Sequence, residues 1–248
     1  MIDPRRYQAV PDLLAGRVVL ITGAGRGIGR VAALTMAAHG ATVILHGRNV
    51  ARLESVYDEI RAAGGPQPAI LPLDLATARD RDFDAMALAI ESQLSRLDGI
   101  VHNASLLSGP APLDVQTLDE WLLLLRVNLA AAFALTRACT ELLRGAPDAS
   151  VVFTSETHAL EPAAYWGGFA VAKSGLAALV RIQAQEWEQR PNVRVNLLVP
   201  GPVDSPQRQA THPGEAQASR RRPEALMPCY LYLLGPDSRG VSGQTIYC

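Results

Sequence analysis

The chain has 248 residues, of which 48% are hydrophobic and 19% are charged, and this length suits one α/β domain over residues 1–248 rather than two. Its formal net charge of −1 excludes the basic surface of a nucleic-acid-binding protein and offers no attraction to an anionic membrane. No uncharged apolar stretch reaches the ~18 residues that a membrane span needs, and residues 1–6 lack the apolar core of a signal peptide. We expect a cytoplasmic protein.

Short β-branched runs alternate with longer helical patterns along the chain, which is typical of a parallel sheet covered by helices on both faces. We expect strands at 18–21, 42–45, 69–73, 99–102, 150–154, 193–199 and 244–247. We expect helices at 27–39, 50–63, 80–94, 118–143, 169–189 and 223–234. The pattern predicts a single doubly wound Rossmann-type α/β domain with about seven parallel strands.

Residues 202–222 are rich in Pro, Gln, Ser and Arg and are predicted to form a mobile loop. Loops of this kind at the edge of a doubly wound sheet often close over a ligand. With the short helix that follows, this loop predicts a substrate lid at about 202–234.

The cysteines and one basic run suggest no separate chemistry. Cys139, Cys229 and Cys248 lie far apart and form no C-x-x-C pair, so we predict neither a disulfide framework nor a metal site. Residues 220–222 are three consecutive arginines, which we interpret as a solvated loop or helix face.

A glycine-rich turn at 22–29 joins the first expected strand to the first expected helix. Gly23, Gly27 and Gly29 let the backbone turn tightly there. They also let a pyrophosphate approach the amide groups at the helix N-terminus, where Ile28 lies. This position between strand and helix predicts a dinucleotide-binding site.

The end of the second strand distinguishes NAD(H) from NADP(H), since an acidic residue there would bind the ribose diol and repel a 2′-phosphate. The chain has Gly47 at that position with Arg48 beside it, and Arg26 lies inside the glycine turn. Two guanidinium groups without a carboxylate favour a phosphate. We expect NADP(H) as the cofactor, in preference to NAD(H).

From residue 12 to residue 244 the chain resembles the short-chain dehydrogenase/reductase family, and within it the YciK-type oxidoreductases. The segments that carry the likeness are the glycine turn, Asp74-Leu75, His102-Asn103-Ala104-Ser105, Val127-Asn128, Lys173 and Pro200-Gly201-Pro202-Val203. The resemblance implies an oxidoreductase that acts on a small-molecule substrate. It also implies cofactor contacts from Asp74, Leu75, Asn103, Ala104, Lys173, Pro200, Gly201, Val203 and Ser205.

The catalytic tetrad of that family is incomplete in this chain. Asn128 and Lys173 match it, but Phe169 stands four residues before the lysine, where the family has tyrosine. Glu156 stands thirteen residues before Phe169, where the family has serine, and Ser155 is adjacent. A phenol one helical turn from an ammonium group can trade a proton with a carbonyl, whereas a phenylalanine ring cannot. Ordinary ketone reduction is therefore expected to be poor.

Four accounts of this site remain open. In the first, Glu156, His158 or Tyr165 supplies the proton, since all three belong to the segment expected to line the pocket. In the second, an imine or iminium accepts hydride directly and Glu156 stabilises its positive charge. In the third, the pocket catalyses a non-redox step. In the fourth, the chain is a pseudoenzyme that binds NADP(H) as a sensor or as a partner subunit.

The resemblance also implies self-association. Family members pair through two long helices, which correspond here to 118–143 and 169–189. We therefore expect a homodimer or homotetramer.

Overall fold

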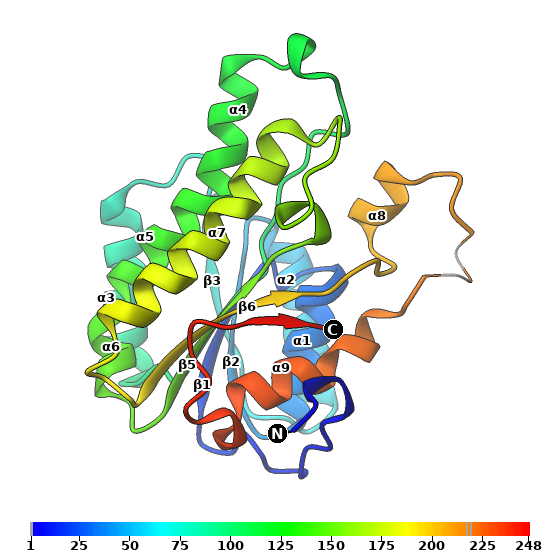
Figure 1. Cartoon of the computed structure of the whole chain (residues 1–248). Coiled ribbons are helices and arrows are strands. Elements are labelled where there is room, and N and C mark those ends of the chain that lie inside the picture. Colours follow the sequence, from blue (N-terminus) through cyan, green and yellow to red (C-terminus); the bar gives the residue numbers. More distant parts are fainter. Residues whose placement is uncertain (1, 217, 219) are drawn as a thin grey trace.

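The computed structural model describes residues 2–216, 218 and 220–248, and its centre is a seven-stranded sheet (Figure 1). All neighbouring strands are parallel, in the order β3-β2-β1-β4-β5-β6-β7. The strands are β1 (Val18–Thr22), β2 (Thr42–Gly47), β3 (Ala69–Pro72), β4 (Gly99–His102), β5 (Ala149–Thr154), β6 (Val193–Val199) and β7 (Thr245–Tyr247). The predicted doubly wound parallel sheet is confirmed.

Helices cover both faces of this sheet. They are α1 (Gly27–Ala38), α2 (Val50–Ala62), α3 (Asp80–Leu94), α4 (Leu118–Leu125), α5 (Ala131–Ala138), α6 (Thr140–Gly145), α7 (Gly167–Glu186), α8 (Pro206–Thr211) and α9 (Met227–Leu234). Short 3-10 segments occur at Pro4–Arg6, Leu113–Val115, Thr157–Ala159, Pro223–Leu226 and Pro236–Ser238. Helices α1, α2 and α9 bury their apolar sides on one face of the sheet, and α3, α5 and α7 bury theirs on the other.

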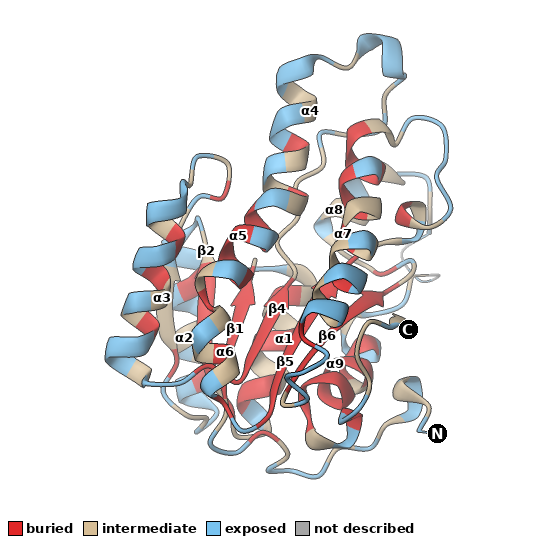
Figure 2. Ribbon diagram, turned by 60° about the vertical axis from the view of Figure 1, so that its left-hand side comes forward, coloured by how far each residue is buried: buried red, intermediate tan, exposed pale blue. Residues whose placement is uncertain are grey.

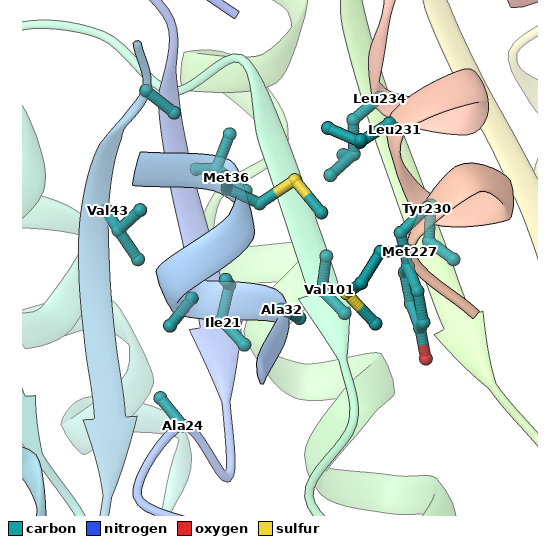
Figure 3. Packing of buried hydrophobic residues seen from close by; sticks show 14 of the residues in the cluster. Ile21, Ala24, Ala32, Met36, Val43, Val101, Met227, Tyr230, Leu231 and Leu234 are labelled. Carbon is teal, nitrogen blue, oxygen red and sulfur yellow. The ribbon is translucent and has the colours of Figure 1, made fainter. Parts of the chain in front are cut away.

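The strands are buried on both sides, which Figure 2 shows as a red layer between the helices. In β1, Val19 and Ile21 face α1 and α9, while Leu20 packs with the opposite helices. Figure 3 shows the first of these layers, with Met36 of α1 and Leu231 of α9 beside the sheet. Burial on both faces explains why the strands read as unbroken apolar runs in the sequence.

The segment predicted as one helix at 118–143 is divided in the structure. Helix α4 ends at Leu125, a π turn spans Arg126–Ala130, and α5 begins at Ala131. Asn128 lies inside the π turn, and its Nδ2 donates a hydrogen bond to the backbone oxygen of Leu124 at 2.9 Å. A polar side chain that bonds the preceding turn competes with the helical backbone bonds. The prediction of an uninterrupted helix is therefore wrong here.

Ion pairs organise the segment between β6 and α9. Ser205 caps α8 by accepting a hydrogen bond from the backbone N–H of Arg208. The guanidinium of Arg208 donates two hydrogen bonds to Glu215, at 2.7 and 3.0 Å, and Arg220 donates a third at 3.1 Å. The Arg220 side chain is only 5% exposed, so the prediction of a solvated basic run is wrong for this arginine. Residues 227–234 of the expected lid pack in the core as α9.

Cys229 and Cys248 form a disulfide between α9 and the strand end beyond β7. The prediction that the cysteines form no disulfide is wrong, although Cys139 remains a free, buried thiol. The two bridged residues are 19 positions apart, and their Cα atoms lie 6.5 Å from each other. Their approach depends on the pairing of β7 with β6, which no local cysteine spacing reports.

Within the described ranges, no helix combines the length and the apolar character required to cross a membrane.

Candidate active site

A cavity of about 530 Å³ lies at the carboxyl ends of the strands, where the loops that follow β1 to β6 meet. This is the edge at which doubly wound sheets bind ligands, next to the point where the strand order reverses. The predicted cofactor-binding residues that line it are Gly23, Arg26, Gly27, Ile28, Arg48, Asp74, Leu75, Asn103, Ala104, Lys173, Pro200, Gly201, Val203 and Ser205. Gly29 alone of that predicted set is not part of the lining.

The glycine turn is packed so closely that side chains would not fit. Gly23 has a φ of +70°, and a Cβ added there would lie 3.0 Å from the Cα of Ala104. A Cβ on Gly29 would overlap the carbonyl oxygen of Gly23 and Nδ2 of Asn103. The backbone N–H groups of Asn103 and Ala104 both donate to Oγ1 of Thr22 at 3.0 Å, which fixes the loop after β4 against this turn. Gly29 therefore allows the turn to pack closely but does not itself line the cavity.

A basic corner, defined as Arg26, Arg48 and Arg52, borders the cavity near the N-terminus of α2. All three side chains are exposed. Among the described residues, none of them pairs with a carboxylate. Asn49 caps α2 by accepting a hydrogen bond from the backbone N–H of Arg52 at 3.0 Å. The sequence analysis did not predict Arg52 as a site residue, because its sequence position does not distinguish it from other arginines on an exposed helix face.

Lys173 projects from α7 toward the end of β5 and is 3% exposed. Its Nζ donates a hydrogen bond to the backbone oxygen of Thr154 at 3.0 Å and lies 5.9 Å from the centre of the Phe169 ring. Burial lowers the pKa of Lys173 to about 8, and the negative charge of Glu156 opposes part of this shift. The ammonium group thus lies beside an aromatic ring instead of a phenol.

Glu156 and His158 form a hydrogen-bonded pair that lines the cavity. Nδ1 of His158 and Oε2 of Glu156 are 2.9 Å apart. The other carboxylate oxygen, Oε1, is buried and has no hydrogen-bonding partner among the described residues. The two side chains are 19% and 22% exposed, respectively. A carboxylate thus borders the cavity at the end of β5.

Ser155, the neighbour of Glu156, also lines the cavity. Its hydroxyl is buried without a partner in the part of the chain that the structure describes, and its backbone N–H donates to the oxygen of Leu198 at 2.8 Å. The tip of β5 therefore presents one hydroxyl and one carboxylate side by side.

An aromatic stack, formed by His158, Trp166 and His212, closes one side of this region. The rings of His158 and Trp166 are stacked with centres 4.0 Å apart and planes 15° apart. His212, at the end of α8, lies 6.0 Å from the Trp166 ring, and so does Phe169. Neither Trp166 nor His212 was predicted, because their meeting depends on how the segment after β6 folds back.

Asn128 and Tyr165 lie outside the large cavity. Oδ1 of Asn128 accepts hydrogen bonds from Oγ of Ser105 and the backbone N–H of Leu106 at 3.1 and 3.0 Å. Asn128 also lines a small internal cavity of about 10 Å³ together with Lys173. Tyr165 has a φ of +75° and its side chain is 57% exposed. The structure therefore does not bring Tyr165 to Glu156 and His158.

Known proteins share this arrangement over nearly the whole chain. The oxidoreductase YciK of Escherichia coli K12 is 39% identical over 239 residues, which cover 96% of this chain and 94% of YciK. A short chain dehydrogenase structure from Pseudomonas syringae is 42% identical, with a TM-score of 0.94 and coverage of 97% of this chain and 98% of that one. One from E. coli CFT073, solved in complex with NADPH, is 39% identical, with a TM-score of 0.93 and coverage of 96% and 99%.

The sequence profile of one family matches most of the sheet and the cavity. It is described as short chain dehydrogenase and matches residues 17–216. That range runs from the start of β1 through the glycine turn, Lys173 and the α8 segment. The chain belongs to the short chain dehydrogenase family.

Proposed function

We propose that this chain is an NADP(H)-dependent oxidoreductase that reduces the C=N bond of an imine or iminium substrate. One observation carries the proposal: the cavity presents the Glu156 carboxylate beside the buried Lys173 and the Phe169 ring. A phenol donor is missing from this place. A carboxylate suits a substrate that becomes or remains positively charged.

The cavity fits NADP(H) at its cofactor end. The glycine turn lines the cavity at the N-terminus of α1, where backbone amide groups can meet a pyrophosphate. The basic corner offers three unpaired guanidinium groups, as a ribose 2′-phosphate requires. The relative from E. coli CFT073 was solved with NADPH, and this supports the same cofactor here. When bound, NADPH supplies a hydride.

Lys173 and Asn128 serve the cofactor end in different ways. An ammonium group has three donors, and Lys173 uses one of them on the backbone oxygen of Thr154. The remaining donors are available for ribose hydroxyls. Asn128 holds the loop at Ser105 and Leu106, which lines the cavity, so we assign it a positioning role.

Glu156 and Phe169 define the substrate end. An iminium carbon is already electrophilic, so hydride transfer to it needs no acid at the carbon's partner atom. A fixed negative charge at this place stabilises the positive charge of the bound substrate in a water-poor cavity. The Phe169 ring, 1% exposed, keeps the floor of that cavity apolar. A neutral ketone would gain no stabilisation from that negative charge.

Calorimetry with NADPH and NADH, followed by turnover of cyclic imines, tests the proposal. We expect tight binding of NADPH, weaker binding of NADH, and a loss of about 10- to 100-fold in NADPH affinity for Arg48→Ala, since a charge-assisted hydrogen bond contributes ~1.5–3 kcal/mol. We expect Glu156→Gln to bind NADPH normally and to lose imine reduction. Equal imine turnover by Glu156→Gln would refute the role of the carboxylate. Binding without turnover of any imine would instead favour a sensor or partner subunit.

We further propose self-association through the helical segments 118–145 and 167–186. Exposed apolar side chains project from them, among them Leu122, Phe133, Val171 and Ile182. A second copy of the chain, related by two-fold symmetry, would cover such a surface with the same surface.

A further inference from the structure

We propose that His158 carries protons between solvent and Glu156, so that the pair protonates a neutral imine before hydride transfer. This inference rests on the proposed function and names the group that returns a proton to Glu156. It assigns an order to the two residues: Glu156 contacts the substrate, and His158 contacts Glu156 and water.

Two-electron reduction of a neutral imine needs one hydride and one proton. Hydride comes from NADPH and reaches the imine carbon, while the proton must reach the nitrogen. In the proposed step, the O–H bond of protonated Glu156 breaks as the N–H bond of the iminium forms. The resulting carboxylate then takes the Nδ1 proton of a His158 imidazolium at Oε2, and solvent protonates the imidazole that remains. Each turnover thus consumes one solvent proton and leaves the pair unchanged.

The two carboxylate oxygens of Glu156 differ in their contacts. Oε2 lies 2.9 Å from Nδ1 of His158, within the range of a proton-transferring hydrogen bond. Oε1 is buried, has no partner among the described residues and belongs to a side chain that lines the cavity. A carboxyl group can exchange the positions of its oxygens by rotating about the Cγ–Cδ bond. Oε2 therefore receives the proton from His158, and this rotation presents it to the substrate.

His158 is more exposed than Lys173 and Asn128, the other polar groups that could deliver a proton. Its side chain is 22% exposed, and its stack on Trp166 holds the ring plane in place. Lys173 is 3% exposed and donates to Thr154, and Asn128 is 2% exposed and bonded to the Ser105 loop.

Charged groups approach His158 from α7 and from the α8 side. Glu156 attracts a proton onto the ring, and Lys173 acts on Glu156 from α7. His212 and His158 both stack on Trp166, and the two imidazoles repel each other when both are charged. Arg208 and Glu215 on the α8 side act on His212 with opposite signs.

A comparison of two substrates distinguishes proton delivery from every other role of His158. 3,4-Dihydroisoquinoline, assayed at a pH where it is neutral, needs a proton. Its N-methyl salt is permanently cationic and needs none. We expect His158→Gln to lower kcat/KM for the neutral imine by at least ~10²-fold and to leave kcat/KM for the N-methyl salt unchanged. Added imidazole should restore reduction of the neutral imine by His158→Ala.

His212→Gln is the matched control, because it removes the other imidazole from Trp166 without touching Glu156. The ratio of the two kcat/KM values should remain that of the unmodified protein. Equal losses with both substrates in His158→Gln would overturn the proposal in favour of a packing role, and no loss with either would also overturn it. If the unmodified protein reduced neither substrate, the proposed function itself would fail, which is a different result.

Discussion

Phe169 places an aromatic ring without a hydroxyl group near Lys173, and a substitution can supply that hydroxyl. The ring lies 5.9 Å from Nζ of Lys173, so a phenol at this position would again stand next to an ammonium group. We expect Phe169→Tyr combined with Glu156→Ser to raise NADPH-dependent ketone reduction by ~10²-fold or more, the contribution of a positioned acid. Steady-state kinetics with simple ketones measures this. Unchanged ketone reduction, with NADPH affinity retained, would show that the cavity cannot seat a ketone.

Lys173 is held in the fold at a cost to stability. Burial lowers its pKa to about 8, so the unfolded chain binds more protons than the folded chain between pH 8 and the ordinary lysine pKa of about 10.4. Stability from this group therefore rises with pH through that window. At pH 7 the burial of this charge lowers the free energy of unfolding by roughly 3 kcal/mol, at about 1.4 kcal/mol per pKa unit.

We expect Lys173→Met to raise the free energy of unfolding at pH 7 by up to roughly 3 kcal/mol, and this advantage to shrink as the pH rises from 8 toward 10.5. Urea unfolding of both proteins at several pH values measures the difference. A gap that stays constant with pH would contradict burial of the charge as its cause.

At the residue scale, sequence motifs predicted the residues of the cofactor end better than those of the substrate end. The residues of the cofactor end, such as Gly23, Arg26 and Arg48, follow directly after strands, and their positions in the sequence place them at one edge of the sheet. Trp166 lines the cavity and meets His212 only because the segment after β6 folds back onto it. Tyr165 was predicted because it lies in the segment expected to line the pocket, but it precedes α7 with a φ of +75° and is 57% exposed.

The turn between β1 and α1 is the element most sensitive to added volume. We expect Gly29→Ala to lower the free energy of unfolding by ~1–3 kcal/mol, the usual cost of overpacking, and to weaken NADPH binding, since the new Cβ meets the Gly23 backbone. Gly64→Ala is the control: its φ is +78° and no atom lies within 4 Å of the added Cβ. That variant should lose about 1 kcal/mol through backbone strain and bind NADPH normally. Equal effects of both substitutions would argue against close packing as the cause.

The elements themselves were predictable to different degrees. The strands were found because a sheet covered on both faces needs apolar runs, and β4 and β6 match their predicted bounds. The break at Asn128 was missed, since its cause is a side-chain hydrogen bond to Leu124 that does not alter the apolar pattern. Helix α8 was missed because its residues are polar, and it is held by a cap at Ser205 and by ion pairs.

At the scale of the whole molecule, the exposed apolar side chains of α4, α5 and α7 predict self-association. We expect Leu122→Glu to lower the molar mass measured by light scattering, because Leu122 is 53% exposed on α4 and a buried charge would oppose the interface. Leu88→Glu on α3, where the side chain is 65% exposed, should leave the mass unchanged. A monomeric unmodified protein would contradict the proposed assembly.

The stacking of Trp166 also gives the molecule a built-in optical reporter. Of its three tryptophans, Trp166 lines the cavity, whereas the indole N–H of Trp121 donates to Gln116 at 2.8 Å and Trp187 is 4% exposed in the core. A change of emission when a ligand enters should therefore arise mainly from one indole, at the boundary between cofactor and substrate. Because that indole touches His158 and faces His212, its spectrum should follow events at the substrate end in real time and without a label.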